Sequence, residues 1–313
     1  MRNSIVCILL SAVILLAAAR PCPAMTRTLM GEPAIVLVAF GTTTRASATY
    51  AFFEEQLRRQ LPDEAKSLRI EWAFTSEIVR ERANRKFAEQ GSPQRYRSLK
   101  QVLADLDDAG YRKIALQPLH IFPGQEYEEL ETVLAAFRSM GMTIEAGGAL
   151  FHRWEWMFET VDVLAPFFLP PEEGSTILVA HGSPLSFVGA NSAYLGLARY
   201  LQEKYPNVFL GGVDGVLTRE QALNAAKARP QRKVRFVPLM FVAGDHIMND
   251  IMGGEPDKDG TPSWAMELAA AGKEVETMKI TWRGEEYFQG LGFHEKIDHL
   301  FIRQLEDSLR RLE

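Results

Sequence analysis

Apolar runs of strand length alternate with helical patterns along the first half of the chain. Between the runs, leucines and other apolar residues recur three or four positions apart, which is typical of one face of a helix. The predicted strands of this half are residues 34–40, 68–74, 113–120 and 143–150. Because such runs are apolar on both faces, they predict a parallel sheet that is covered by helices.

The same order of strands and helices repeats after a proline-rich link at residues 169–171. The last predicted helix runs through residues 297–309, where apolar residues again stand four apart. The predicted strands of this second half are residues 176–180, 208–213, 233–241 and 275–282.

The two halves also match in their residues. Val-Ala-Phe-Gly-Thr at residues 38–42 aligns with Val-Ala-His-Gly-Ser at residues 179–183, and Gly124 aligns with Gly244. A chance match between valine-rich strands is the alternative explanation. We predict two similar α/β lobes that face each other across a cleft. Their predicted boundaries are residues 33–168 and 175–313.

The beginning of the chain has the pattern of a secretory leader. An uncharged apolar run at residues 5–19 follows Arg2, and small residues precede a plausible cleavage point after Ala24. The run is short for a bilayer span, although an uncleaved anchor helix is the alternative. We therefore expect residues 1–24 to be a signal peptide, the mature protein to be periplasmic, and no stable membrane insertion after cleavage.

Composition and charge narrow the function classes. With 47% hydrophobic and 24% charged residues among 313, the chain is neither disordered nor a polytopic membrane protein. Its formal net charge of -5 shows no basic excess of the kind that phosphate neutralisation requires, so we expect no nucleic-acid partner. The glycine-rich phosphate loops are absent, which predicts no nucleotide cofactor. Cleavage after Ala24 would remove both cysteines, Cys7 and Cys22, and leave His, Asp and Glu as metal ligands.

Four polar side chains fall at the ends of predicted strands or in the facing element of the other half. His181 and Asp214 directly follow strands of the second half, and His246 lies on the turn after the next strand. Glu126 occupies the position of the first half that aligns with His246. Ligands of open parallel sheets bind beyond the carboxyl ends of the strands. Each residue alone has a structural alternative, such as a turn or a helix start. Together they predict a cleft that can bind a divalent metal and accept protons.

These motifs resemble the ATP-independent class II chelatases, in particular the periplasmic form of the sirohydrochlorin cobaltochelatases. The resemblance covers essentially the whole chain after the leader, and Ala-Gly-Asp-His-Ile-Met-Asn-Asp at residues 243–250 is its most specific part. It also rests on the motifs at residues 38–42, 119–121, 124–128, 179–182 and 238–246. It implies two flavodoxin-like halves, each a parallel sheet with helices on both faces, and a tetrapyrrole bound between them.

The resemblance also implies roles for the four side chains. His181 would be the catalytic base and a metal ligand, His246 a second ligand, and Asp214 an acidic ligand where the family often has Glu. Glu126 would be the catalytic carboxylate of the facing lobe. The expected reaction is insertion of Co²⁺, as substrate metal, into sirohydrochlorin, with Fe²⁺ or Ni²⁺ as alternative metals. A non-catalytic periplasmic carrier of tetrapyrrole or metal is the alternative function, and bound haem and homo-oligomer formation stay open.

Two further expectations concern the surroundings of the cleft. A polycarboxylate substrate calls for basic residues at the rim, and Arg45, Arg153 and Arg283 are the candidates. His120 ends a predicted strand and can line the same cleft. Residues 253–262 have the composition of a mobile flap, or of a plain solvated linker.

Overall fold

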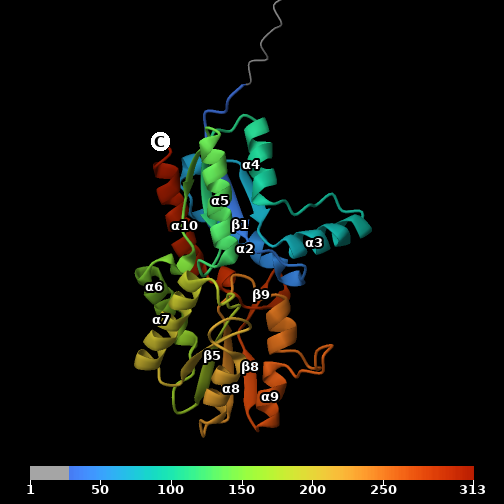
Figure 1. The fold of residues 1–313 in the computed structure, drawn as a ribbon, viewed down its shortest axis with the longest axis vertical. Coiled ribbons are helices and arrows are strands. Elements are labelled where there is room, and N and C mark those ends of the chain that lie inside the picture. The colour runs from blue at the N-terminus through green and yellow to red at the C-terminus, as the bar shows by residue number, and fades with distance from the viewer. Residues whose placement is uncertain (1–27) are drawn as a thin grey trace, which may run out of the picture.

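The computed structural model describes residues 28–313, so the predicted signal peptide lies outside the described residues. Two parallel four-stranded sheets form the centres of two lobes, which stand one above the other in Figure 1. The N-terminal sheet has the order β2 (Ile70–Phe74), β1 (Ala34–Ala39), β3 (Lys113–Pro118), β4 (Thr143–Ala146). The C-terminal sheet has the order β6 (Val208–Gly212), β5 (Gly174–Ala180), β7 (Lys233–Pro238), β8 (Glu274–Thr277). The two orders are equivalent, which confirms the predicted α/β fold of two similar halves.

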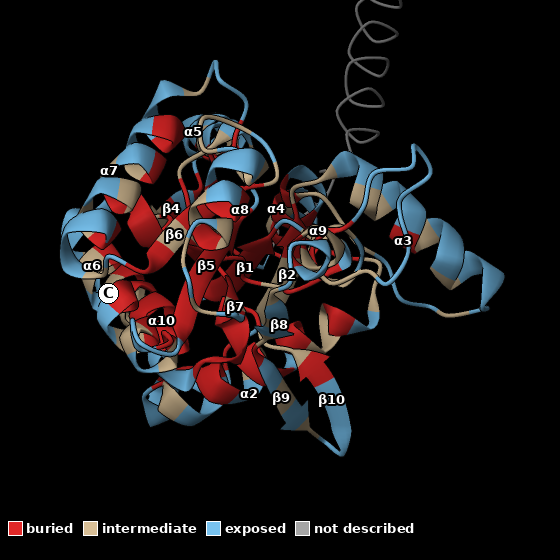
Figure 2. Cartoon of the chain, turned by 90° about the horizontal axis from the view of Figure 1, so that it is seen from below, coloured by how far each residue is buried: buried red, intermediate tan, exposed pale blue. Residues whose placement is uncertain are grey.

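Helices cover both faces of each sheet. They are α2 (Ala48–Gln60), α3 (Glu77–Glu89), α4 (Leu99–Asp108), α5 (Gln125–Ser139), α6 (Trp154–Leu164), α7 (Val188–Lys204), α8 (Arg219–Lys227), α9 (Trp264–Ala270) and α10 (Glu295–Arg310). Alternate residues of β1 explain the layering, because Val36 packs against α4 and α5 whereas Leu37 packs in the core with α2 and α10. Figure 2 shows the buried strands in the middle and exposed surface on the outer faces of the helices.

The lobes exchange a helix. Helix α10, at the end of the chain, packs on the N-terminal lobe, where Lys113 Nζ of β3 donates to the carbonyl oxygen of Leu312 at 2.7 Å. Helix α6 packs beside α7 of the C-terminal lobe, with ring centroids of Phe158 and Tyr200 4.5 Å apart. Figure 1 shows α10 in the same lobe as α5, and α6 beside α7 in the other lobe. All strands of the N-terminal sheet precede those of the C-terminal sheet along the chain, whereas α6 and α10 each pack with the lobe whose sheet is formed by the other half.

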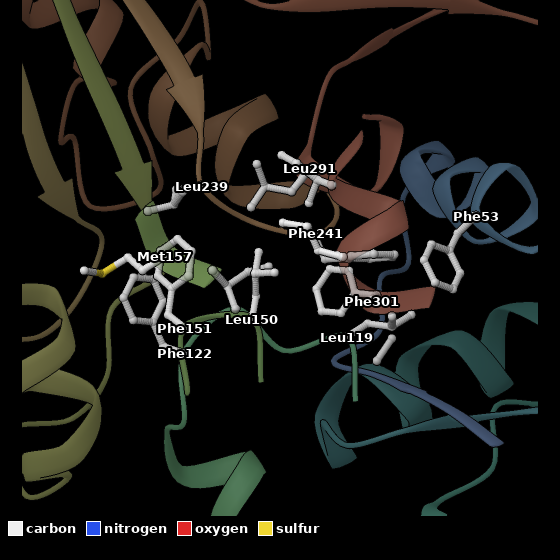
Figure 3. Packing of buried hydrophobic residues seen from close by; sticks show 14 of the residues in the cluster. Phe53, Leu119, Phe122, Leu150, Phe151, Met157, Leu239, Phe241, Leu291 and Phe301 are labelled. Atoms are coloured by element: carbon white, nitrogen blue, oxygen red, sulfur yellow. The ribbon is translucent and has the colours of Figure 1, made fainter. Parts of the chain in front are cut away.

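One hydrophobic core continues from lobe to lobe (Figure 3). Phe301 of α10 is fully buried, and its ring centroid lies 6.3 Å from that of Phe53 and 5.8 Å from that of Phe241. Phe53 belongs to α2 of the N-terminal lobe, and Phe241 follows β7 of the C-terminal lobe. The lobes are therefore joined by packed aromatic side chains as well as by the connecting chain.

The strand predicted at residues 275–282 is wrong as a single element. The chain breaks after β8, and β9 (Lys279–Trp282) pairs antiparallel with β10 (Glu285–Phe288) in a separate hairpin. Arg283 and Gly284 form its turn with φ of 51° and 83°. Two successive residues with positive φ are the requirement of the tight hairpin turns that match the twist of the strands. Within residues 28–313, no helix is long and apolar enough to cross a membrane.

Candidate active site

A cleft of about 470 Å³ lies between the lobes, beyond the carboxyl ends of the strands. All four side chains singled out in the sequence line it, namely Glu126 from the N-terminal lobe and His181, Asp214 and His246 from the C-terminal lobe. The repeat explains this convergence, because strand ends that are equivalent in the two lobes open onto the same space. The structure thus brings the predicted residues together, while their chemical roles stay predictions.

Two touching loops hold His181 and Asp214 side by side. The backbone N–H of Asp214 donates to the carbonyl oxygen of His181 at 3.0 Å. Gly182 adopts φ of +92°, and a Cβ there would lie 1.8 Å from the carbonyl oxygen of Asp214. Only glycine permits this approach, so the Ala-His-Gly pattern fixes where the imidazole leaves the strand.

His246 begins the π-helix η5 (His246–Ile251). Its ring centroid lies 5.0 Å from that of His181, with 75° between the ring planes. On its other side, Nδ1 of His246 lies 2.5 Å from Oδ2 of Asp250. The two imidazoles are therefore neighbours in the cleft, and one of them is held by a carboxylate.

The surroundings of His181 favour its neutral form. Its ring opens to the cleft on one side, while protein packed on the other sides lowers its pKa by partial burial, and the nearby His246 lowers it further. The carbonyl group of Gly182 and the charges of Glu126 and Asp214 act in the opposite direction without reversing the shift. A neutral imidazole can donate a lone pair to a metal or accept a proton. No group of three His, Cys, Asp or Glu side chains within residues 28–313 is arranged closely enough to hold a metal ion.

The N-terminal lobe presents a different wall. Phe40 stands where the repeat has His181, and its ring centroid lies 5.5 Å from that imidazole. His120 lines the cleft, as its place at a strand end indicated, and burial lowers its pKa to about 4. Its Nε2 lies 3.3 Å from Oγ1 of Thr75. This wall therefore presents an aromatic ring and a neutral imidazole to the cleft, in addition to the carboxylate of Glu126.

The basic side chain of the cleft is not one of the expected arginines. Arg45 and Arg153 stack on Tyr287 and Trp156, and Arg283 stacks on Trp282 while it pairs with Glu55. Arg82 lines the cleft instead, from helix α3. Sequence reasoning missed it because α3 buries only Ala83 and so lacks an apolar stripe. The only signal of α3 in the sequence was its run of charged residues with helical spacing.

Tyr194 is a second lining residue that the sequence did not reveal. It lies in the middle of α7, and its hydroxyl oxygen accepts the backbone N–H of Gly182 at 3.1 Å. Its ring stacks on Phe122 with centroids 3.6 Å apart. Burial raises the pKa of its phenol, so the group stays protonated. Tyr194 thus supports the loop that carries His181.

Residues 253–262 do not line this cleft. Residues 253–257, 261 and 262 border a second pocket of about 640 Å³ together with Asp250, Val213 and Trp264. Asp250 therefore lies between the two spaces, with His246 facing one and the loop facing the other.

The fold of the chain is similar to that of solved chelatase structures. The chain is similar to SirB from Bacillus subtilis with Fe³⁺, at a TM-score of 0.56 and 17% identity over 88% of this chain and 95% of that one. It is also similar to the sirohydrochlorin chelatase SirB of the subspecies spizizenii in complex with cobalt, at a TM-score of 0.54, 15% identity, and coverage of 90% and 96%. The fold is therefore that of the two-lobed chelatases.

The sequence comparisons identify the family. A sirohydrochlorin cobaltochelatase, CbiKC, of Nitratidesulfovibrio vulgaris strain Hildenborough is 30% identical over 251 residues, which span 78% of this chain and 82% of that protein. The sirohydrochlorin cobaltochelatase of Salmonella typhimurium strain LT2 is 25% identical over 284 residues, 89% of this chain and 97% of that protein. The family model for cobalt chelatase (CbiK) matches residues 33–310. The chain belongs to the cobalt chelatase (CbiK) family.

Proposed function

We propose that this chelatase inserts Co²⁺ into sirohydrochlorin without ATP. The observation that carries the proposal is the pair His181 and His246, whose ring centroids lie 5.0 Å apart in a cleft that Glu126 enters from the other lobe. The relatives named sirohydrochlorin cobaltochelatase support the choice of metal and tetrapyrrole.

Metal insertion requires protein ligands that can release the ion to the macrocycle, and groups that can accept protons. The macrocycle loses two pyrrole N–H protons as its four nitrogens replace the ligands that delivered the metal. His181 and His246, whose rings are neighbours, hold the incoming ion at one face of the macrocycle, and Asp214 completes the ligand set only when its loop draws in towards the ion, because no three such side chains of residues 28–313 are close enough before that. Once a macrocycle nitrogen has replaced His181 at the metal, the freed lone pair of its neutral imidazole takes one proton. Glu126 accepts the other proton from the facing lobe.

Arg82 supplies the positive charge for the substrate's carboxylates. It is exposed on α3 and lines the cleft, and α3 projects from the N-terminal lobe in Figures 1 and 2. A guanidinium group binds a carboxylate through two parallel hydrogen bonds. Arg82 therefore orients the macrocycle rather than taking part in proton transfer.

An anaerobic optical assay with sirohydrochlorin and Co²⁺ tests the proposal. We expect multiple turnovers from wild-type protein, a loss of about 10²–10⁴-fold in His181→Ala, and mainly a raised KM for Co²⁺ in His246→Ala. Arg82→Gln should raise the KM for sirohydrochlorin alone. His299→Ala is the matched control, because His299 bonds to Gln60 on the surface. A spectral change that stops at one equivalent of protein would instead make the protein a carrier.

We also propose that the protein works in the periplasm, on the strength of the leader pattern at residues 1–24. Amino-terminal sequencing of protein recovered from the periplasmic fraction should begin near Met25. An intact amino terminus in the cytoplasmic fraction would refute this location.

A further inference from the structure

The π-helix η5 presents two faces. Ile247 and Ile251 are fully buried and fix the helix to the core of the C-terminal lobe. His246 and Asp250 directly precede these two isoleucines in the sequence, so they are also four residues apart. Both side chains are partly exposed. The N–H of Met252 donates to the carbonyl oxygen of Ile247 at 3.0 Å, the five-residue step of a π-helix.

Within η5, the carboxylate of Asp250 lies directly behind the imidazole of His246. Oδ2 of Asp250 is 2.5 Å from Nδ1 of His246. A carboxylate without a proton can only accept a hydrogen bond, so in this contact the hydrogen is on Nδ1 of the imidazole. The lone pair of that ring is then on Nε2, the nitrogen that remains for the cleft.

We propose that Asp250 is a positioning residue, which fixes the tautomer and the ring direction of His246 so that Nε2 can receive the substrate metal. The inference rests on the proposed function for the role of His246 as a ligand. Its physical basis is general, because metal-binding histidines are commonly oriented by a carboxylate on the second ring nitrogen. Asp250 itself borders the second pocket and not the cleft, so it acts through His246.

A simple surface ion pair is the competing explanation. The side chains of His246 and Asp250 are 36% and 42% exposed, and exposed pairs four residues apart contribute little to stability. Asn249 of η5 makes a comparable exposed contact, because its side-chain amide donates a hydrogen bond to Oδ1 of Asp245, the residue before the helix, at 2.8 Å. An ion pair alone would leave the His246 tautomer and the metal affinity unchanged when it is removed.

Two variants separate these explanations. Asp250→Asn keeps the shape of the side chain, but its amide can also donate to Nδ1 and so permits the other tautomer. Asp250→Ala removes the partner. Glu255→Gln is the matched control, because Glu255 borders the same second pocket and carries the same charge.

The first readout is the tautomer of His246 in ¹⁵N-histidine-labelled mature protein, assigned by comparison with His246→Ala. We expect Nδ1–H in the wild type and in Glu255→Gln, and a mixture of tautomers in both Asp250 variants. The second readout is the KM for Co²⁺, which should rise by about 10- to 100-fold in Asp250→Ala with the KM for sirohydrochlorin unchanged. Asp250→Asn should lie between.

The outcomes distinguish the two proposals. Unchanged tautomer and unchanged KM for Co²⁺ in both Asp250 variants would overturn the positioning role. The other outcome is that the Asp250 variants change the tautomer of His246 but the wild-type protein does not turn over sirohydrochlorin. In that case the positioning role of Asp250 stands and the proposed function is overturned. If Asp250→Ala fails to fold, the near-isosteric Asp250→Asn decides both readouts.

Discussion

Replacing Asp298 by Asn should make the free energy of unfolding of the protein less sensitive to rising pH. Asp298 lies on α10 with no solvent exposure, and neither carboxylate oxygen has a hydrogen-bond partner among the described residues. Burial, with a smaller contribution from the charge of Glu295, raises the pKa of this carboxyl well above 3.8. The folded protein therefore holds a proton that the unfolded chain releases above its ordinary pKa near 4.

The sign and size follow from proton linkage. Since the folded state binds more protons, stability falls as the pH rises from the unfolded pKa towards the folded one. The slope for one such group is about 1.4 kcal/mol per pH unit. Asn has no proton to lose, so the stability of Asp298→Asn relative to wild type should increase by about that amount for each pH unit in this window. A buried amide has a cost of its own, but that cost does not change with pH.

Urea unfolding followed by circular dichroism, at half-unit steps from pH 4.5 to 7, measures this difference. The matched control is Asp307→Asn, on the exposed part of the same helix, where the carboxylate pairs with Arg310. The control makes the same substitution on the same helix and leaves Asp298 in place. A difference between Asp298→Asn and wild type that does not change with pH would refute the claim that this carboxyl is neutral in the folded protein.

Two other changes test the packing and the loop geometry. Phe301→Ala should lower the free energy of unfolding by about 3–5 kcal/mol, because the ring is fully buried between the lobes, and Phe301→Leu should lose less; equal losses in urea unfolding would contradict this packing argument. Gly182→Ala should impair metal insertion and lower stability, because the added Cβ would lie 1.8 Å from a carbonyl oxygen. The control is Gly189→Ala, where an added Cβ has nothing within 4 Å, and it should behave like wild type in the optical assay and in a melting experiment. Normal activity and melting in Gly182→Ala would mean that the two loops can separate freely.

The sheets and the four cleft residues could be predicted because their signals are local. A run such as β1 is buried at every position, so its apolar sequence directly reports its surroundings. His181 and Asp214 follow strand ends, and parallel topology then places them at one edge. The repeat supplied the facing lobe and hence Glu126.

The features that were missed depend on contacts between distant parts of the chain. Arg82 is recognisable as a cleft residue only when α3 has been placed, and α3 shows almost no buried face in its sequence. The apolar stripe of α10 indicates that the helix is covered, but it does not say which sheet covers it. The break after β8 depends on a hairpin turn at Arg283, a residue type that rarely adopts positive φ.

Helix α10, which packs on the N-terminal lobe, sets the order in which the two lobes can finish folding. Residues of β1 that face α10 are among the first of the described chain to be synthesised, whereas α10 is the last helix. A nascent chain that has already formed the N-terminal sheet still exposes Leu37 and its neighbours on one side until α10 has left the ribosome. The first lobe to emerge is thus completed only after the strands of the second lobe have been synthesised.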